Sequence, residues 1–466
     1  MGLFGADTYV VRRAKLRQMV GDGVILIPAN LHAPNSYPNN PYYFRQDSSF
    51  RYLFGINEPS LVGVLDCDSG EDRLFGDNPT LTDMIWTGDL PSLSEMASAV
   101  GVTKTASTSE LYRYVAEAQS SGRAIHILPP YRGETKLQLS DLLGIHPKEL
   151  DRYFSAELIF AMSLLREVKS GEEIAELEDA YTIGLLMHTT AMRMTRAGVT
   201  EREVSGVLAG IAQSQGGGVS FPTIYTQHGE ILHNTSQDGV LTDGRLVLCD
   251  AGAENLAGYC SDHTRTYPVS GSFSPIQRDI YNTVLEAHYH VREIAHAGML
   301  YSDLHRSATM KLAEGLRDIG LVRGSLEEIE ASEAIKLFMP HGVGHSLGMD
   351  VHDCEAFGER SFDYAKYEDL ARETKTGVCR KYWQLREGSV ITNEPGVYFI
   401  GALIDQSLRE GLYTSTVNYD LINTLRDFGG IRIEDDLAIT AEGCREIGAE
   451  NPIPKSIAEI ESFMNR

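Results

Sequence analysis

A ten-residue pattern occurs twice in this 466-residue chain and constrains the fold more than any other feature. Residues 243–252 read DGRLVLCDAG and residues 387–396 read EGSVITNEPG, so both follow acid-Gly-x-apolar-apolar-x-x-acid-x-Gly. A further acid follows each copy, Asp262 after the first and Glu434 after the second, and each lies four residues beyond a glycine. A repeat determines architecture as well as chemistry. The chain is therefore expected to contain two related halves, each of which brings two carboxylates to strand ends.

The segments before the two copies predict two helices in each half. Ser170 and Thr200 each begin a capping box, and Ser274 with Pro275 is typical of a helix start. The predicted helices cover residues 171–198, 201–215, 275–298 and 303–319. Each half therefore has the order helix, helix, histidine, acid, acid, which favours one domain made of two facing halves.

The first third of the chain has a different pattern. Residues 9–20 predict a helix, residues 24–27 a buried strand, and residues 50–56 and 61–65 two paired strands. This alternation is typical of an α/β domain. We expect an α+β protein with a smaller α/β domain at residues 1–155 and the two-halved domain at residues 156–466.

Composition excludes several classes of partner. The chain has 41 basic and 65 acidic residues, a net charge of −24, which disfavours nucleic acid and anionic membrane surfaces. No apolar run approaches the roughly 20 residues of a membrane span, and no signal peptide is apparent. The six cysteines are scattered without a CxxC motif, which favours reduced thiols and a cytoplasmic location.

Four acids that end the strands predict a metal site. Asp250 and Glu394 belong to the repeat, and Asp262 and Glu434 follow it. Four buried carboxylates without cations would repel one another strongly, and two divalent ions remove that repulsion. Carboxylates together with an imidazole form an oxygen-rich set, which suits Mn²⁺ and leaves Co²⁺ and Zn²⁺ open. Two such ions roughly 3.5–4 Å apart can activate water and polarise a carbonyl group.

Histidines and one arginine complete the candidate site. His341, His345 and His352 lie within twelve residues that also contain three glycines, which predicts a loop rather than a helix. One imidazole can bind metal while the others donate hydrogen bonds to substrate. Strand alternation puts Arg432 on the same face as Glu434.

Other polar residues are given ordinary structural roles. His288 has no evident carboxylate partner in the sequence and is expected to be packed or solvated, and Trp86 and Trp383 are expected to be packing residues. Three common catalytic signatures are absent from the sequence: the Gly-rich phosphate-binding loop, the HExxH motif of zinc proteases and the GxSxG motif of serine hydrolases.

These motifs, taken in order, resemble the pita-bread metallopeptidases, and within them the aminopeptidase P and prolidase branch. The N-terminal run YYFRQDSSFRYLFGINEP at residues 42–59 is similar to the aminopeptidase P N-terminal domain. The matching pieces of the larger domain are LREVKSGEEI at 165–174, ILHN at 231–234, LCDAG at 248–252, SDHTRT at 261–266, residues 341–353, NEPG at 393–396 and GIRIED at 430–435.

The resemblance implies roles for individual residues. It implies five metal ligands: Asp250, Asp262, His345, Glu394 and Glu434. It implies that His233, His341 and His352 surround the substrate and that Arg432 joins the polar network beside it. The implied reaction hydrolyses the bond between an N-terminal residue and a following proline: a hydroxide bridging two metal ions attacks while Glu394 moves the proton.

Three features depart from the family pattern, and the first is the spacing of twelve between Asp250 and Asp262, where eleven is commoner in this branch. Phe221 occupies the place of an aromatic residue that is often Tyr in relatives, so one phenolic hydrogen bond to the network of Arg432 is expected to be absent. Residues 401–429 form a long stretch between the last two acids, interpreted as an inserted flap.

Three functions remain open besides the Xaa-Pro aminopeptidase. A prolidase would be restricted to Xaa-Pro dipeptides by a blocked pocket. A non-catalytic binding protein of the same fold, or a metal-free hydrolase, would be expected to lack ligands that this chain has. Family analogy also implies a homodimer or homotetramer.

Overall fold

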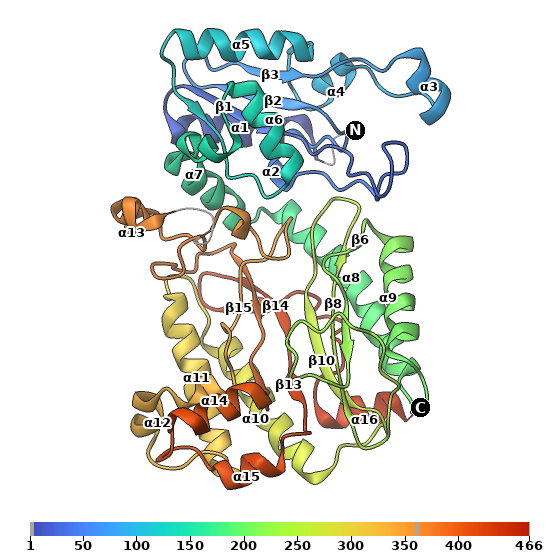
Figure 1. Cartoon of the computed structure of the whole chain (residues 1–466), viewed down its shortest axis with the longest axis vertical. Coiled ribbons are helices and arrows are strands. Elements are labelled where there is room, and N and C mark those ends of the chain that lie inside the picture. Colours follow the sequence, from blue (N-terminus) through green and yellow to red (C-terminus); the bar gives the residue numbers. More distant parts are fainter. Residues whose placement is uncertain (1–3, 359–362, 466) are drawn as a thin grey trace. The chain divides into compact units, whose positions relative to one another are not determined.

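The computed structural model describes residues 4–358 and 363–465 (Figure 1). These residues form two compact units, one made of the chain up to Arg166 with residues 354–379, the other of residues 167–353 and 380–466. The α+β class with two domains is confirmed, whereas the predicted boundary at residues 155 and 156 stays a prediction. The six cysteines all lie in the described ranges, and no two of them are joined by a disulfide there. No helix in these ranges is long and apolar enough to cross a membrane.

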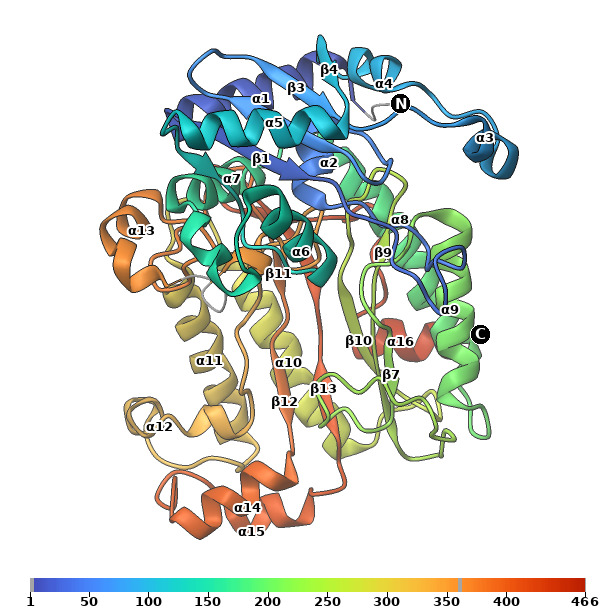
Figure 2. The ribbon, with the colours of Figure 1, turned by 45° about the horizontal axis from the view of Figure 1, so that its top comes forward.

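The first unit is built on a five-stranded sheet with strand order β4-β3-β2-β1-β5. The strands are β1 (Val24–Pro28), β2 (Val62–Asp66), β3 (Asp72–Phe75), β4 (Lys104–Ala106) and β5 (Ile125–His126). The helices around them are α1 (Ala6–Val20), α2 (Ser48–Phe54), α3 (Leu81–Thr87), α4 (Leu93–Ala99), α5 (Thr108–Ser120), α6 (Gly133–Leu143) and α7 (Ala156–Glu167) (Figure 2). Strand β1, which lies between β2 and β5, is buried on both faces: Val24 and Leu26 join the core beneath α5 and α6, and Ile25 and Ile27 are also buried. This confirms the buried strand.

One predicted strand of the first unit is a helix. Residues 50–56 were expected to pair with residues 61–65, but α2 occupies the first segment and β2 pairs with β1 and β3. Asp47 caps α2 by accepting a hydrogen bond from the Phe50 N–H, and Gly55 ends the helix in the left-handed conformation. Capping at both ends and complete burial of α2 therefore outweigh the strand preference of its aromatic residues.

Trp86 is also placed differently from the prediction. It lies on α3, a helix with no buried residue, and is 82% exposed. Trp383 is packed as expected, because its ring stacks on Tyr301 and its Nε1 donates to Glu167. Chain composition alone could not separate these two tryptophans.

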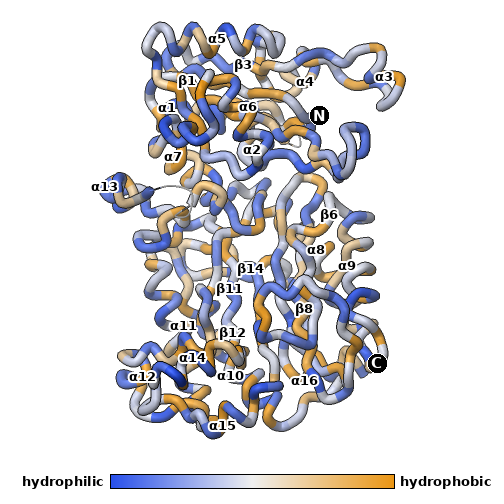
Figure 3. The backbone as a smooth tube through the Cα atoms, in the orientation of Figure 1, coloured by the Kyte–Doolittle hydropathy of each residue, from blue (hydrophilic) through white to orange (hydrophobic). Residues whose placement is uncertain are grey.

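The second unit contains the two predicted helix pairs. They are α8 (Gly171–Met194) with α9 (Glu201–Gln215), and α10 (Pro275–Ile294) with α11 (Tyr301–Asp318). The capping boxes at Ser170 and Thr200 and the helix start at Ser274 are confirmed, and α8 and α10 each end four residues before the predicted residue. Figure 1 shows one pair on each side of the strands, and along α9 the hydropathy colours of Figure 3 alternate. The buried residues Val204, Leu208 and Ala212 of α9 lie four residues apart, as on one face of a helix.

Strands from both halves meet between the helix pairs. The first half supplies β6 (Gly218–Val219), β7 (Ile224–Thr226), β8 (Leu246–Ala251), β9 (Ala253–Glu254) and β10 (His263–Pro268). The second supplies β11 (Val390–Asn393), β12 (Gly396–Tyr398), β13 (Gly430–Arg432), β14 (Asp435–Ile439) and β15 (Cys444–Glu446). The sheets are β10-β8-β7 and β11-β14-β15, with smaller pairs β12-β13 and β6-β9. An antiparallel bridge between Thr264 and Glu434 joins the two halves where the predicted acids lie.

The remaining helices lie outside this repeat. They are α12 (Leu326–Ser332), α13 (Glu368–Thr374), α14 (Gly401–Glu410), α15 (Tyr419–Thr424) and α16 (Ile457–Met464). The 401–429 stretch thus contains α14 and α15. It packs near α11: Asn418 donates to the Gly320 carbonyl, and Val417 forms a bridge with Val322.

Candidate metal centre

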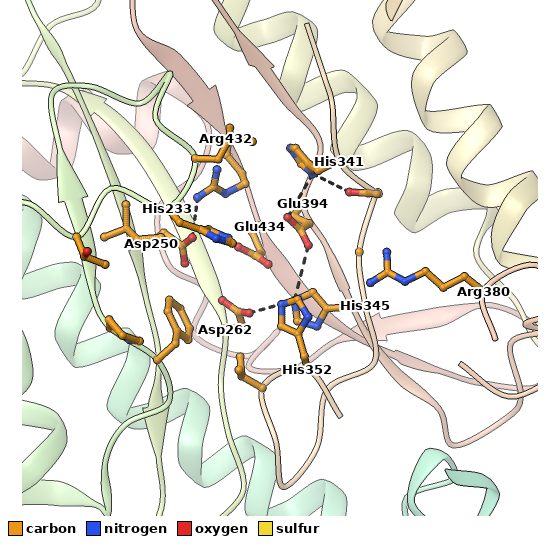
Figure 4. Close-up of a pocket in the computed structure, with 18 residues that line it drawn as sticks. His233, Asp250, Asp262, His341, His345, His352, Arg380, Glu394, Arg432 and Glu434 are labelled. Carbon is orange, nitrogen blue, oxygen red and sulfur yellow. Dashed lines mark hydrogen bonds and ion pairs between the residues drawn. The ribbon is translucent and has the colours of Figure 1, made fainter. Parts of the chain in front are cut away.

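All ten residues that the sequence predicted for the site line one cavity of about 540 Å³ in the second unit (Figure 4). They are Phe221, His233, Asp250, Asp262, His341, His345, His352, Glu394, Arg432 and Glu434. Both halves of the repeat therefore contribute to the same cavity. No residue of the 401–429 stretch is among the residues that line this cavity, and the interpretation of the stretch as an inserted flap stays a prediction.

The first pair of acids is positioned by the hairpin of β8 and β10. Asp250 lies on β8 opposite Thr264, and Asp262 directly precedes β10. The glycine of the repeat, Gly252, is required here because a Cβ at this position would overlap the Ser261 carbonyl oxygen. The chain can therefore bring both carboxylates into the cavity only by a close approach of two backbone segments.

The second pair is positioned by the matching segments of the other half. Glu394 follows β11, and Glu434 lies between β13 and β14. The backbone of His345 is held against β11. Its backbone N–H donates to Thr392 Oγ1 at 3.0 Å, and its carbonyl oxygen accepts from the Thr392 backbone N–H at 2.9 Å. The loop predicted for residues 341–353 is confirmed, and its pairing with β11 places the His345 imidazole beside Glu394.

Three of the predicted ligands have atoms close enough for one ion. Ligand atoms of Asp262, His345 and Glu434 all lie within 4.8 Å of one another. His345 Nε2 is 3.3 Å from Asp262 Oδ2 and 3.7 Å from Glu394 Oε1. Dashed lines in Figure 4 join His345 to these two carboxylates. Nδ1 of the same ring lies 3.1 Å from the Ser346 carbonyl oxygen. A proton on Nδ1 satisfies that carbonyl and leaves the Nε2 lone pair directed at the carboxylates, the form in which imidazole binds a metal.

The electrostatics of the carboxylates fit divalent cations. Burial, and then repulsion by neighbouring carboxylates, raises the pKa of Asp262 and of Glu434 well above the ordinary value. Burial also raises the pKa of Glu394. Oδ1 of Asp250 is buried and has no hydrogen-bond partner among the described residues. Two positive ions would remove the repulsion and occupy the unpaired oxygen, so the donor set suits the predicted metals.

A hydrogen-bonded network lies beside these carboxylates. Arg432 donates from Nη2 to Asp250 Oδ2 at 2.6 Å and from Nε to Thr264 Oγ1 at 3.1 Å. Its Nη1 donates to the hydroxyl of Tyr398 at 2.9 Å. The Tyr398 hydroxyl is also 2.9 Å from Nε2 of His341. Burial, followed by the charge of Arg432, lowers the pKa of His341 to about 3, so this imidazole is neutral at physiological pH.

Two family models match the chain. The model described as metallopeptidase family M24 matches residues 175–441, which is more than half of the chain. The model described as the aminopeptidase P N-terminal domain matches residues 9–127. The chain belongs to metallopeptidase family M24. The resemblance drawn from the repeated acids and the histidine loop is confirmed.

Relatives of this M24 chain are similar to it over nearly the whole length. A probable Xaa-Pro aminopeptidase of Aspergillus clavatus is 30% identical and covers 97% of this chain and 95% of its own. The human Xaa-Pro dipeptidase is 27% identical and covers 90% of this chain and 84% of its own. The solved structure of aminopeptidase P from E. coli with the inhibitor Pro-Leu has a TM-score of 0.79 at 28% identity, and covers 99% of this chain and 98% of that one. These matches confirm the predicted fold and the aminopeptidase P and prolidase branch.

Two residues of this M24 site were missed by the sequence reasoning. Tyr398 supplies the phenol that Phe221 lacks, and strand alternation from Glu394 through Gly396 to Tyr398 was the signal that could have identified it. Gly396 permits this arrangement, since a Cβ there would collide with the Tyr398 hydroxyl. Arg380 also lines the cavity, but no repeat or spacing marks it in the sequence.

The two outer histidines of the cavity differ in their surroundings. The His352 ring stacks on the His345 ring with 3.6 Å between centroids and a 17° angle between planes. His233 is exposed and comes from the segment after β7 in the first half. Both therefore lie where a bound molecule could reach them, while His345 is buried with the carboxylates.

Proposed function

We propose that this M24 metallopeptidase is a Xaa-Pro aminopeptidase, which removes the N-terminal residue of a peptide whose second residue is proline. The observation that carries the proposal is the cage of four carboxylates and His345 in one cavity, with His233, His341, His352 and Arg432 beside it. The relatives named Xaa-Pro aminopeptidase and the match to the aminopeptidase P N-terminal domain support it.

The proposed ligands are Asp250, Asp262, His345, Glu394 and Glu434, which would hold two divalent ions. Mn²⁺ suits their oxygen-rich donor set, and Co²⁺ and Zn²⁺ are the other candidates. Two bound ions supply an activated water and polarise the scissile carbonyl. Because the donors come from both halves of the repeat, the duplication explains why one domain supplies a cage for two ions.

The chain's own residues would position the substrate and move the proton. Glu394 is half-buried and its pKa is raised, so it can accept a proton from water and pass it to the leaving nitrogen. The acidic cavity would attract the free α-amino group of a peptide. The proline nitrogen of the scissile bond carries no N–H, so the site needs no acceptor for one. His341, which is neutral, would contact the peptide together with the exposed His233 and His352.

A peptide series with controlled metal content tests the proposal. The purified protein is stripped of metal, restored separately with Mn²⁺, Co²⁺ and Zn²⁺, and given a Xaa-Pro dipeptide, a Xaa-Pro-Yaa tripeptide and a Xaa-Ala-Yaa control. The proposal expects metal-dependent release of Xaa from the proline tripeptide and little from the alanine control. Absence of cleavage of every proline peptide in all three metals would contradict it.

The same series decides the alternative, a Xaa-Pro dipeptidase, which the similarity to the human Xaa-Pro dipeptidase favours. Cleavage of the dipeptide without cleavage of the tripeptide would establish that alternative. Manganese as the physiological metal, a cytoplasmic location and a homodimer or homotetramer stay predictions.

A further inference from the structure

A second cluster of buried acids lies directly behind the candidate metal centre. Strand alternation turns Glu434 into the cavity and its neighbour Asp435 the opposite way, and both are buried. Ligand atoms of His288, Asp435 and Glu446 lie within 4.8 Å of one another, the spacing of a metal site. His288 is packed, as one of the two expected roles had it, but it does have a carboxylate partner, because its Nε2 is 3.1 Å from Asp435 Oδ2.

The rear cluster already contains a cation. Nζ of Lys455 donates to Asp435 Oδ2 at 2.6 Å and to Glu446 Oε1 at 2.8 Å. Arg265 adds a second positive charge, with Nη2 donating to Asp435 Oδ1 at 2.6 Å. Arg292 is a third, since its Nη1 donates to Glu446 Oε1 at 3.1 Å, so the charge of the two carboxylates is fully offset by cations of the chain itself. In the candidate metal centre, by contrast, the Arg432 guanidinium is hydrogen-bonded to only one of the four carboxylates, that of Asp250.

Arg265 holds the backbone of a proposed metal ligand. Its Nη1 donates to the Glu434 carbonyl oxygen at 2.7 Å and to the Thr264 carbonyl oxygen at 3.0 Å. Its remaining donors reach Asp435 and the carbonyl oxygens of Ile453 and Pro454. These bonds use all five N–H donors of the guanidinium group. Arg265 is completely buried, so no water competes for these acceptors.

Glu434 is thus held by three hydrogen bonds with Arg265 and Thr264, two residues that do not line the cavity. The Arg265 guanidinium holds its carbonyl, the Thr264 carbonyl accepts its N–H at 3.0 Å, and Thr264 Oγ1 donates to its Oε2 at 2.6 Å. The orientation of Arg265 depends in turn on the tail at residues 453–455, which lies beyond the residues 175–441 matched by the M24 family model.

We propose that Arg265 and Lys455 are positioning residues for the metal ligand Glu434. The C-terminal tail, which contributes Lys455 and holds Arg265, thereby sets the affinity of the five ligands for metal. The inference rests on the proposed function, since it takes Glu434 to be a ligand. Neither side chain lines the cavity, so neither would touch the substrate. Removing a residue that is hydrogen-bonded to a metal ligand typically lowers metal affinity by roughly 10- to 100-fold.

Calorimetric titration of Mn²⁺ alone into metal-free protein tests this inference, together with thermal unfolding of each metal-free variant. Lys455→Met removes the ammonium group, and Arg265→Lys keeps the charge but cannot reach all five acceptors. Each is expected to weaken Mn²⁺ binding by roughly 10- to 100-fold. If Lys455→Met does not fold, the Arg265→Lys variant decides the outcome.

The matched control is Arg278→Met, which loosens the same tail at another point. Arg278 forms an ion pair with Glu461 on α16, and neither residue is bonded to Asp435 or Glu434. This variant is expected to unfold at a lower temperature but to bind Mn²⁺ within twofold of the original chain. Unchanged Mn²⁺ affinity in folded Arg265→Lys, or equal weakening in Arg278→Met, would overturn the inference. Failure of the original chain to bind Mn²⁺ would instead refute the proposed metal centre.

Discussion

The hydroxyl of Tyr398 lies 2.9 Å from Nη1 of Arg432 and 2.9 Å from Nε2 of His341, so one phenol joins the arginine of the site to a histidine. The direction of these bonds follows from the donors. Nδ1 of His341 is 2.8 Å from the Gly342 carbonyl oxygen and must carry the proton. Nε2 therefore accepts from the hydroxyl, and the hydroxyl oxygen accepts from Arg432.

Replacing Tyr398 with Phe is expected to lower kcat/KM by about tenfold or more. The change leaves a buried donor of Arg432 without its acceptor, and an unsatisfied buried hydrogen-bonding group costs about 1–3 kcal/mol. Steady-state kinetics on a Xaa-Pro tripeptide measures the effect. The matched control is Tyr225→Phe, which removes a buried hydroxyl bonded to Thr195 outside the cavity and should leave kcat/KM unchanged. Equal activity of the Tyr398→Phe variant would show that the network has no role in turnover.

Replacing Glu434 with Gln is expected to abolish metal binding and yet to stabilise the metal-free protein. The pKa of Glu434 is raised well above its ordinary value by burial and by the neighbouring carboxylates, so between the two pKa values the folded metal-free chain holds a proton that the unfolded chain releases. Stability of the metal-free protein should thus fall as pH rises from about 4.5 toward that raised pKa. The amide of Gln carries no titratable proton, so the variant should not lose stability over this pH range. Thermal unfolding without metal at pH 5 and pH 8 measures it, and a lower melting temperature of the variant at pH 8 would contradict the prediction.

The core of the metal site could be predicted from the sequence because it rests on local rules. Asp250 and Glu394 repeat at matched offsets, and alternation along a strand places Arg432 with Glu434. Helix starts at Ser170 and Thr200 follow from capping chemistry. These signals lie within a few residues of the feature that they predict, so tertiary contacts did not override them.

The features that could not be predicted depend on contacts distant in sequence. Residues 48–54 have aromatic side chains typical of a strand but are helical because Asp47 and Gly55 cap them and neighbours bury them. His288 pairs with Asp435, 147 positions later in the sequence, and nothing in the local pattern of α10 indicates that partner. Arg380 reaches the cavity from a segment without a repeat or a motif. For such residues the sequence gives the residue type but not its neighbour.

In the first unit, replacing Asp66 with Asn is expected to cost about 2 kcal/mol of stability at pH 7. Burial would raise the pKa of Asp66, but bonds from Tyr114, Arg123 and the Ser69 N–H outweigh it and lower the pKa to about 2. The carboxylate is therefore more acidic in the folded chain than in the unfolded one. Its stabilisation is fully present above about pH 4 and is lost as pH falls toward 2, so the difference between variant and original chain should shrink in acid.

Hydrogen exchange of the β2 amides at pH 7 and pH 3 measures this local stability without requiring the whole chain to unfold. The control is Asp68→Asn, because Asp68 also pairs with Arg123 but its side chain is 47% exposed, and exposed pairs contribute little. If Asp66→Asn lowers the protection of the β2 amides equally at both pH values, the titration argument is contradicted.

The glycine that ends the first copy of the repeat gives the last prediction. In Gly252→Ala the new methyl group would overlap the carbonyl oxygen of Ser261, the residue directly before the proposed ligand Asp262. The hairpin must then open, so both Mn²⁺ affinity and kcat/KM are expected to fall by tenfold or more. The control is Gly206→Ala in α9, where a Cβ meets nothing within 4 Å and an exposed helix position should gain about 1 kcal/mol. Mn²⁺ titration and denaturant unfolding of both variants measure the effects. Wild-type Mn²⁺ affinity in Gly252→Ala would show that the repeat does not need its glycine to bring the two acids together.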